Sequence, residues 1–405
     1  MTKLCRHCQS PLVLDFLDLG HAPPSNAYLS VADLSRPEIT FPLRLKACSR
    51  CRLVQTEDFA EAESLFTADY AYYSSTSRSW LDHAERYAAM ITERLGLNAD
   101  SQVIEVASND GYLLKNFVSS GIPCLGIEPT QGTADAARAL GVPVLQAFFG
   151  DELAQSLEPA DLIIGNNVYA HVPDINDFTR GLYGALKSEG VITLEFPHVM
   201  RLVEFNQFDT VYHEHFSYLS LFAVTEIMAA ANLRIFDVEE LPTHGGSLRI
   251  YACRTSARHR VTPAVAALAA EERARGMDTD AYYTAFQTRA ETVKNDFLRF
   301  LLDARAEGRS VAAYGAAAKG NTLLNFAGVR PDLVPFVCDA AAAKVGKFLP
   351  GSHIPIRSPS VLTTERPDYL IIFPWNIESE IRAQNAALAE AGTRFVTAVP
   401  ELRIS

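Results

Sequence analysis

Val103-Ile-Glu-Val-Ala-Ser-Asn-Asp-Gly-Tyr-Leu-Leu114 is the stretch that decides how this chain of 405 residues is organised. It begins with a short apolar run, continues through small and turn-forming residues, and becomes apolar at helical spacing from Tyr112 to Val118. This pattern predicts a strand, a loop and a helix, with a second strand that ends at Glu128. Strands and helices then alternate as far as about Thr255, which predicts a doubly wound parallel sheet.

The loop after the first strand indicates a cofactor that carries positive charge and no phosphate. A dinucleotide site needs several glycines, because the pyrophosphate approaches bare backbone, and this loop offers only Gly111. Glu105 and Asp110 would also repel a pyrophosphate. S-adenosylmethionine, with its ammonium and sulfonium groups, is the better electrostatic match, and Glu128 is placed to accept ribose hydroxyl groups. The alternative is an ordinary βαβ unit with solvated acids.

Other parts of the chain are expected to contribute to the same site, because ligands bind outside the carboxyl ends of parallel strands. A third strand is expected at 142–145, before three residues placed to hold an adenine ring, and a fourth at 162–165, before Asn167 and His171. A structural role for these last two is an equal alternative. The expected cofactor-binding residues are Glu105, Ala107, Asn109, Asp110, Gly111, Tyr112, Glu128, Pro129, Ala147, Phe148, Phe149, Asn167, Tyr73 and Ser75.

Composition excludes several classes of protein. The net charge is −12, whereas nonspecific nucleic-acid binding needs clustered Lys and Arg. No run of about 18 apolar residues is present, and residues 1–5 lack the pattern of a signal peptide. We therefore expect a cytoplasmic monomer that acts on a small molecule, with neither nucleic acid nor membrane as a partner.

Four of the seven cysteines form a doubled C-x2-C pattern, Cys5-Arg-His-Cys8 and Cys48-Ser-Arg-Cys51. Each pair supplies two thiolates from one tight turn, and two turns complete a tetrahedron around one zinc ion with no open position. A closed site of this kind is structural, and disulfides are a poor alternative in a cytoplasmic chain. We expect His7 to lie beside the site rather than in it. Metal binding is expected to supply much of the stability of this small module.

The segment 65–78 is unusually rich in tyrosines and hydroxyl groups, and it lies where a lid over a pocket would be placed. Tyr70, Tyr72, Tyr73 and Ser75 are candidates for lining that pocket, with a packed linker as the alternative. An amphipathic helix is expected from Trp80 to Leu97.

Tyr212-His-Glu-His-Phe-Ser-Tyr218 is the densest chemical cluster. It does not match H-E-x-x-H, so a catalytic zinc is not expected. In a helical turn, Tyr212 and His215 would share a face, whereas in a strand His213 and His215 would share one. Both alternatives stay open at this point.

The sheet pattern restarts after a helical stretch at 257–308. A strand at about 311–314 enters a loop of small residues with two glycines and Lys319, followed by a helix, and such a cationic loop suits a diphosphate. This part of the chain predicts a second Rossmann-like layer. The expected substrate-binding residues are Tyr70, His244, Gly245, Ser247, Arg249, Tyr314, Gly315, Ala316, Lys319, Gly320, Asn321, Trp375 and Asn376.

Four features together resemble the sugar C-methyltransferases of deoxysugar and antibiotic biosynthesis. They are the four-cysteine module, Glu-Val-Ala-Ser-Asn-Asp-Gly at 105–111, Tyr-His-Glu-His at 212–215 and Gly-Ala-Ala-Ala-Lys-Gly at 315–320. The resemblance covers essentially the whole chain. It implies an α/β protein with a zinc-binding module and lid at 1–78, a class I methyltransferase domain with a doubly wound sheet at 79–255, and a C-terminal Rossmann-like domain for a sugar nucleotide at 256–405.

The resemblance also implies a reaction, which is methylation at C3 of a 4-keto sugar carried on dTDP. The branch that acts on 3-amino-4-keto sugars, as in D-tetronitrose biosynthesis, is the most similar. By this resemblance His215 is the base, Tyr212 faces the sugar oxygen and Glu214 positions a group nearby, with His171 and Tyr72 as further catalytic candidates. The competing functions are a zinc-containing methyltransferase acting on nucleic acid and a non-catalytic protein that senses sugar nucleotides.

Overall fold

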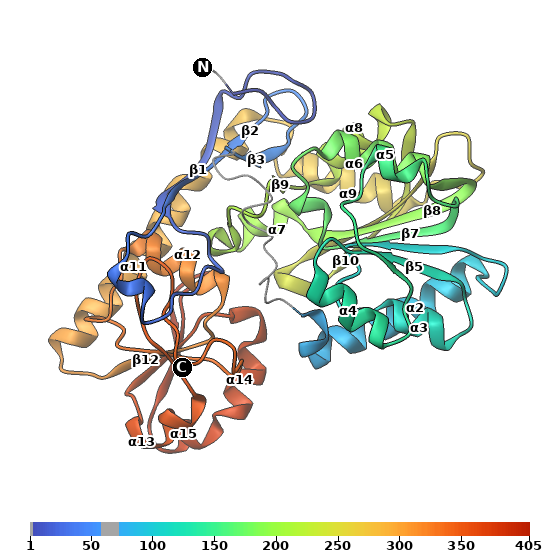
Figure 1. Cartoon of the computed structure of the whole chain (residues 1–405). Coiled ribbons are helices and arrows are strands. Elements are labelled where there is room, and N and C mark those ends of the chain that lie inside the picture. The colour runs from blue at the N-terminus through green and yellow to red at the C-terminus, as the bar shows by residue number, and fades with distance from the viewer. Residues whose placement is uncertain (1–2, 58–72) are drawn as a thin grey trace.

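The computed structural model describes residues 3–57 and 73–405, which form three β-sheets with their helices. Figure 1 shows the zinc module and the C-terminal domain on one side of the molecule and the largest sheet on the other. No helix in the described ranges is long and apolar enough to cross a membrane.

The largest sheet has seven strands in the order β10-β11-β8-β7-β4-β5-β6. Only β11 runs antiparallel to its neighbours. The strands are β4 (Val103–Val106), β5 (Cys124–Ile127), β6 (Val144–Leu145), β7 (Ala160–Asn166), β8 (Leu186–Pro197), β10 (Leu233–Leu241) and β11 (Ser247–Arg254). The third strand, β6, is thus shorter than the expected 142–145, and β7 begins before the expected start at 162.

Helices cover both faces of this sheet because its central strands are apolar on both sides. Val103 packs toward α2 and α3, whereas its neighbour Ile104 packs toward α6 and α8. The helices are α2 (Arg78–Leu95), α3 (Leu114–Ser119), α4 (Gln131–Ala139), α5 (Asp151–Ala154), α6 (Ile175–Gly184), α7 (Val199–Glu204) and α8 (Leu221–Ala230). Short 3-10 turns are η2 (Ser74–Thr76), η3 (Tyr169–His171), η4 (Phe208–Thr210) and η5 (Thr243–Gly245).

The zinc module is built on an antiparallel sheet in the order β1-β2-β3-β9. Its elements are β1 (Leu14–Ala22), η1 (Asp33–Ser35), β2 (Phe41–Ala47), β3 (Val54–Thr56) and β9 (Ser217–Tyr218). The fourth strand therefore comes from a distant part of the chain, directly after the cluster at 212–215. Val54 pairs with Tyr218, and Gln55 pairs with Ser217.

The C-terminal domain has a six-stranded sheet in the order β14-β13-β12-β15-β16-β17, with only β17 antiparallel. Its strands are β12 (Val311–Tyr314), β13 (Val337–Cys338), β14 (Ile356–Arg357), β15 (Tyr369–Ile372), β16 (Arg394–Thr397) and β17 (Arg403–Ile404). Its helices are α9 (Pro263–Ala274), α10 (Asp280–Thr284), α11 (Phe286–Ala306), α12 (Ala318–Ala327), η6 (Pro359–Val361), α13 (Leu362–Glu365), η7 (Trp375–Ile377), α14 (Glu378–Gln384) and α15 (Ala386–Glu390).

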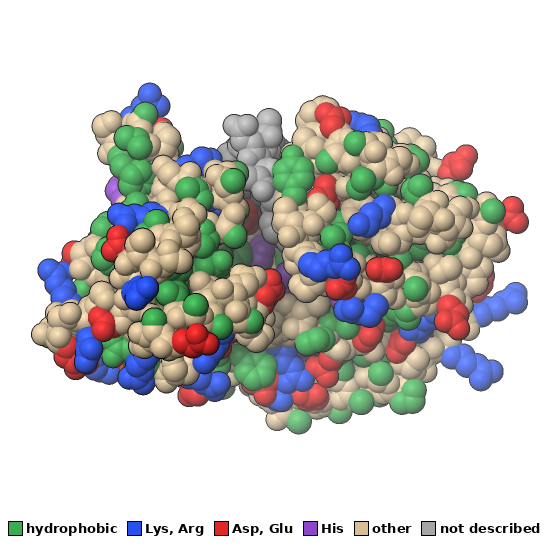
Figure 2. Space-filling view, turned by 90° about the horizontal axis from the view of Figure 1, so that it is seen from below, with side chains coloured by type: hydrophobic (Ala, Val, Ile, Leu, Met, Phe, Trp, Pro, Cys, Tyr) green, Lys and Arg blue, Asp and Glu red, His purple; other side chains and the backbone are tan. Residues whose placement is uncertain are grey.

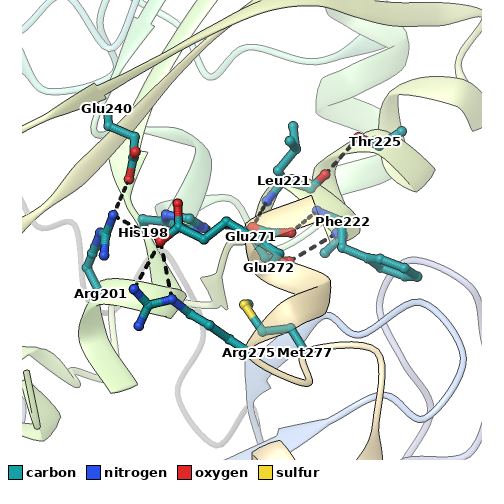
Figure 3. A network of polar contacts seen from close by, with 12 residues as sticks. His198, Arg201, Leu221, Phe222, Thr225, Glu240, Glu271, Glu272, Arg275 and Met277 are labelled. Atoms are coloured by element: carbon teal, nitrogen blue, oxygen red, sulfur yellow. Dashed lines mark hydrogen bonds and ion pairs between the residues drawn. The ribbon is translucent and has the colours of Figure 1, made fainter. Parts of the chain in front are cut away.

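A buried carboxylate fastens α9 to elements of the seven-stranded sheet domain (Figure 3). Glu272 is 2% exposed, and it accepts hydrogen bonds from the backbone N–H groups of Leu221 and Phe222 and contacts His198 Nε2 at 2.7 Å. The first turn of α8 and the start of α7 are therefore held by one side chain. Phe16 of β1 stacks on Phe286 of α11, with ring centroids 5.1 Å apart. The helix α11, which follows α9 and α10 in the chain, therefore supports the zinc module. The domain limits at residues 78 and 255 stay predictions.

Candidate active site

The four cysteines of the doubled C-x2-C pattern meet in one cluster. Their sulfur atoms all lie within 4.8 Å of one another, with Cys5 and Cys51 at 3.5 Å and Cys8 and Cys48 at 3.5 Å. A tetrahedron of thiolates bound to zinc at about 2.3 Å has sulfur atoms about 3.8 Å apart, so the cluster fits a zinc ion. His7 points away to Asn176 Oδ1, 2.8 Å from its Nδ1, which agrees with its expected place beside the site.

The loop between β4 and α3 holds an unusual backbone conformation. Ala107 and Asn109 both have positive φ, 57° and 50°, although neither is glycine. Such strain persists only where the surroundings enforce it and is concentrated at functional sites. Glu128 supplies part of that enforcement, because its carboxylate accepts hydrogen bonds from Asn109 N, Thr130 N and Thr133 Oγ1 at 3.0 Å each.

The segment before α2 closes over this loop. Ser74 N donates to Asn109 Oδ1 at 3.0 Å, and Ser75 N donates to Asp110 Oδ2 at 3.1 Å. Tyr73 lies over the start of α4, where a side chain on Gly132 would come within 3.0 Å of its hydroxyl group. Tyr70 and Tyr72 lie outside the described residues.

The charges of the loop fit a cation such as the ammonium group of S-adenosylmethionine. Asp110 Oδ1 is buried and has no hydrogen-bond partner in the described part of the chain, and both amide atoms of Asn166, at the end of β7, are likewise unpaired there. Burial, and next the charges of Glu128 and Asp110, raise the pKa of Glu105 well above its usual range. This shift works against the negative charge expected of Glu105, whose part in cofactor binding stays a prediction.

The two phenylalanines expected beside an adenine ring, Phe148 and Phe149, have different surroundings. Phe149 packs edge-on against Phe178 at 5.1 Å, so its ring joins the core, whereas Phe148 is 62% exposed. Phe148 is therefore the more exposed ring of the pair, and Ala147 and Pro129 are partly exposed. Tyr112 is buried and stacks on Trp80 at 6.0 Å.

Residues 212–215 of the cluster form a turn rather than a strand, and strand β9 begins only at Ser217. His215 N donates to Tyr212 O at 3.2 Å, and the two rings lie edge-on with centroids 4.7 Å apart. His213 points the other way and contacts the backbone oxygen of Phe41 at 3.3 Å. Tyr212 and His215 therefore share a face, and His213 has no place on it.

Two neutral histidines lie side by side on this face. The rings of His171 and His215 are 4.5 Å apart and nearly perpendicular. Burial lowers the pKa of His171 to about 4. Burial, followed by the charges of His171 and His244, lowers the pKa of His215 well below its usual range, against a hydrogen bond with the backbone of Thr210. Both imidazoles are therefore uncharged at neutral pH and able to accept a proton.

Residues of the zinc module reach the same place, which the sequence did not indicate. Asn26 Nδ2 donates to Glu214 Oε1 at 2.7 Å, and Tyr28 Oη donates to the backbone oxygen of Ala316 at 2.6 Å. Burial raises the pKa of Glu214 to about 7. No local pattern marks Asn26 or Tyr28, because their partners are 188 and 288 positions away in the chain.

The C-terminal domain faces this cluster with a lysine and a tryptophan. Lys319, in the first turn of α12, lies 4.0 Å above the ring of Trp375 and donates to Asn376 Oδ1 at 2.7 Å. Burial lowers the pKa of Lys319 to about 8. Trp375 Nε1 donates to Asp209 Oδ2 at 2.8 Å, and burial raises the pKa of Asp209 to about 6. Asp209 was also missed, although an acid three residues before Tyr212 could have been noticed.

Several residues of the expected substrate-binding set are engaged in contacts within the chain. Arg249 is 2% exposed and pairs with Glu195 at 2.7 Å and Glu239 at 2.8 Å, so the expectation that it binds substrate is not supported. Asn321 is 1% exposed and donates to the backbone of Ser25. Further residues of that set are buried, in close contact or hydrogen-bonded within the chain, namely Tyr314, Gly315, Ala316, Gly320, Gly245 and Ser247.

His244 remains at the junction between the cofactor loop and the lysine. Its Nε2 lies 3.2 Å from Asn167 Nδ2, and both residues have positive φ, 53° and 54°. Figure 2 shows a cleft between the two halves of the molecule with histidine side chains inside it. Trp80 lies between Tyr112 and His244, with ring centroids 6.0 Å and 5.2 Å away, and the charge of Lys319 contributes to the lowered pKa of His244.

Comparisons with known proteins agree with this architecture. Family models match residues 5–66 as a zinc binding domain, 80–238 as a methyltransferase domain and 242–400 as a C-methyltransferase C-terminal domain. C-methyltransferase NovU of Streptomyces niveus is 35% identical over 404 residues, which cover 99% of this chain and 96% of NovU.

Solved structures similar to this chain include two bacterial methyltransferases. One is an S-adenosylmethionine-dependent methyltransferase from Clostridium acetobutylicum, with 10% identity, 43% of this chain and 92% of that chain covered, and a TM-score of 0.35. The other is magnesium protoporphyrin IX methyltransferase from Synechocystis, with 13% identity, 43% and 82% covered, and a TM-score of 0.35. These low values add nothing to the assignment.

The sheet order, the loop after β4 and the family models define a class I S-adenosylmethionine-dependent methyltransferase with an N-terminal zinc-binding domain. Within that class, the chain belongs to the C-methyltransferase family that includes NovU.

Proposed function

We propose that this C-methyltransferase acts at C3 of a 4-keto-deoxysugar carried on dTDP, with a 3-amino sugar as the first substrate to test. The observation that supports the proposal is the pair of neutral, half-buried histidines, His171 and His215, whose rings meet beside Tyr212. Carbon methylation next to a ketone needs a base to remove a proton and a donor to hold the resulting oxyanion.

In the proposed reaction His215 accepts the proton from C3. The electrons of the broken C3–H bond form a C3=C4 double bond, and the C4 carbonyl oxygen becomes the enolate oxygen. Tyr212 can donate a hydrogen bond to that oxygen, because burial keeps the pKa of its hydroxyl group well above the usual range. S-adenosylmethionine supplies the electrophilic methyl group when it is bound, and Asp110, Asn166 and Glu128 are the residues proposed to hold it.

The substrate end of the site is proposed to lie at the start of α12. Ala317 precedes this helix without a side-chain cap, so backbone N–H groups of its first turn remain for an anion beside Lys319. Glu214, held by Asn26, is proposed to orient the sugar. The cytoplasmic location and the monomeric state stay predictions.

Exchange of the C3 hydrogen in heavy water tests the base directly. Wild-type protein with dTDP-4-keto sugar and a cofactor analogue that lacks the methyl group should exchange this hydrogen, as followed by proton NMR. His215→Asn should lose exchange and methylation together, by roughly 10²–10⁴-fold, the range of general-base catalysis. Tyr212→Phe should slow both less. Full C3 exchange in His215→Asn would reject His215 as the base and transfer the role to His171 or a tyrosine.

The same arrangement predicts the stereochemistry. If the base and the methyl group approach opposite faces of the sugar, the configuration at C3 is inverted in the product. Retention of configuration, determined from nuclear Overhauser contacts between the new methyl group and the ring hydrogens of the product, would contradict this geometry.

A further inference from the structure

One hydrogen bond connects the C-terminal domain to the turn that holds the proposed base. Trp375, at the start of η7, donates through its indole N–H to Asp209, which belongs to η4 and is 2% exposed. The other carboxylate oxygen of Asp209 has no hydrogen-bond partner in residues 3–57 and 73–405. The position of this buried acid therefore depends on the tryptophan.

The residue after Asp209 acts directly on His215. The backbone of Thr210 is close enough to the His215 imidazole to act as its hydrogen-bond partner, which raises the pKa of that ring. A neutral imidazole has one N–H donor and one acceptor nitrogen, and a carbonyl partner at one nitrogen leaves the lone pair on the other. The placement of Thr210 thus decides which nitrogen of His215 can take a proton.

Close contacts on the Trp375 ring hold it in a fixed position. A Cβ atom on Gly245 would lie 2.4 Å from Trp375 Cη2, and Gln207 Nε2 donates to the backbone oxygen of Gly245 at 2.7 Å. From the other side, Thr322 Oγ1 of α12 donates to the backbone oxygen of Val211 at 2.9 Å. The indole therefore sits between η4 and the loop that carries His244.

We propose that Trp375 and Asp209 are positioning residues for His215, so that the C-terminal domain sets the tautomer and orientation of the base through the backbone of Thr210. The inference rests on the proposed role of His215. It assigns the C-terminal domain a part in proton transfer beyond substrate anchoring. Lys319 stacks on the same indole ring, so the helix proposed to hold the diphosphate and the base share one support.

Nitrogen-15 NMR of histidine side chains tests this without any substrate. The chain has ten histidines, and the signal lost in His215→Asn identifies His215. Wild type should show a single neutral tautomer. Trp375→Phe keeps an aromatic ring but removes the N–H donor, and it should give a mixture of tautomers at His215. Asp209→Ala breaks the same bond from the other side, whereas Asp209→Asn keeps an acceptor for the indole and should restore the wild-type signal.

Kinetics provide the second readout. Trp375→Phe and Asp209→Ala should lower kcat by roughly 10–100-fold, as expected for a misplaced catalytic group, with the KM for S-adenosylmethionine unchanged. Arg305→Gln, which breaks an exposed ion pair with Asp332 in the same domain, is the control and should match wild type. An unchanged His215 tautomer in both variants, or a change confined to the KM of the sugar nucleotide, would overturn the inference. Persistent C3 exchange in His215→Asn would instead overturn the proposed base and leave the tautomer result standing.

Discussion

Replacing Glu272 should weaken the attachment of α9 to the methyltransferase domain. The Glu272 carboxylate lies among three partners in the interior, His198 Nε2 at 2.7 Å, Leu221 N at 2.7 Å and Phe222 N at 2.8 Å (Figure 3). These two backbone groups are first-turn amides of α8, which have no partner inside their own helix. Removing the carboxylate leaves them buried without an acceptor.

The expected magnitude follows from the number of lost bonds. A buried donor left without its partner costs about 1–3 kcal/mol, so Glu272→Ala should cost about 4 kcal/mol in total. Glu272→Gln keeps one oxygen, which still serves His198 and Leu221, but its amide N–H₂ group faces Phe222 N–H. This variant should cost about 2 kcal/mol. Glu271→Gln is the matched control, because the Glu271 side chain is 36% exposed and forms ion pairs with Arg275 and Arg201, where the cost is at most about 1 kcal/mol.

Hydrogen exchange at the amides of Leu221 and Phe222 measures this locally, which matters because a multidomain chain has no single unfolding free energy. A loss of about 2 kcal/mol corresponds to roughly 30-fold faster exchange in Glu272→Gln. Glu271→Gln should leave both amides protected. Equal exchange rates in the two variants would refute the reasoning, since the burial of Glu272 would then have no energetic consequence.

Three further predictions concern the metal, the cofactor and pH. Freshly purified protein should contain one zinc ion per chain, and Cys48→Ser should lower solubility and melting temperature; absence of zinc in metal analysis would contradict the site. Glu128→Ala should weaken binding of S-adenosylmethionine by about 2 kcal/mol in calorimetry, because three hydrogen bonds that shape the loop are lost, and unchanged affinity would place the ribose elsewhere. The pKa of His171 is about 4 in the folded protein against 6.5 unfolded, so the unfolded state holds more protons between these values and stability should fall as pH drops from 6.5 to 4. His171→Asn should show a smaller fall in melting temperature from pH 7 to pH 5 than wild type, and equal falls would disprove the assignment.

Local patterns allowed the parts of the fold that depend on local chemistry to be predicted. Two cysteines in a C-x2-C pair form a tight turn whatever the surrounding fold. The apolar run that begins at Val103 likewise ends as a strand where small residues follow it. Both predictions were made from a few neighbouring residues, and the four cysteines and β4 are found as expected. The choice between turn and strand at Tyr212 was out of reach, because a hydrogen bond from Tyr212 N to Tyr218 Oη and the pairing of β9 with β3 shape that segment.

The remaining differences come from contacts between distant segments. Phe149 and Phe148 are identical in type and adjacent, yet only the packing of α6 decides that Phe149 turns inward. Arg249 lies on β11 opposite Glu195 of the neighbouring strand β8, and the two side chains form an ion pair. The sequence alone did not show this pairing. Asp209 and Trp375 are 166 residues apart, and no pattern along the chain links them.

The fourth strand of the zinc module, β9, comes from a distant part of the same chain, and this has a consequence for synthesis on the ribosome. β1, β2 and β3 emerge early, but their partner β9 follows only after the 160 residues 57–216 have been added. At roughly 5–20 residues per second, the outer edge of β3 waits for on the order of ten seconds or longer. An open strand edge invites pairing with other chains. β3 is only three residues long, which limits that risk. Early binding of zinc by the nascent chain would hold the two C-x2-C turns in place until Ser217 and Tyr218 are synthesised.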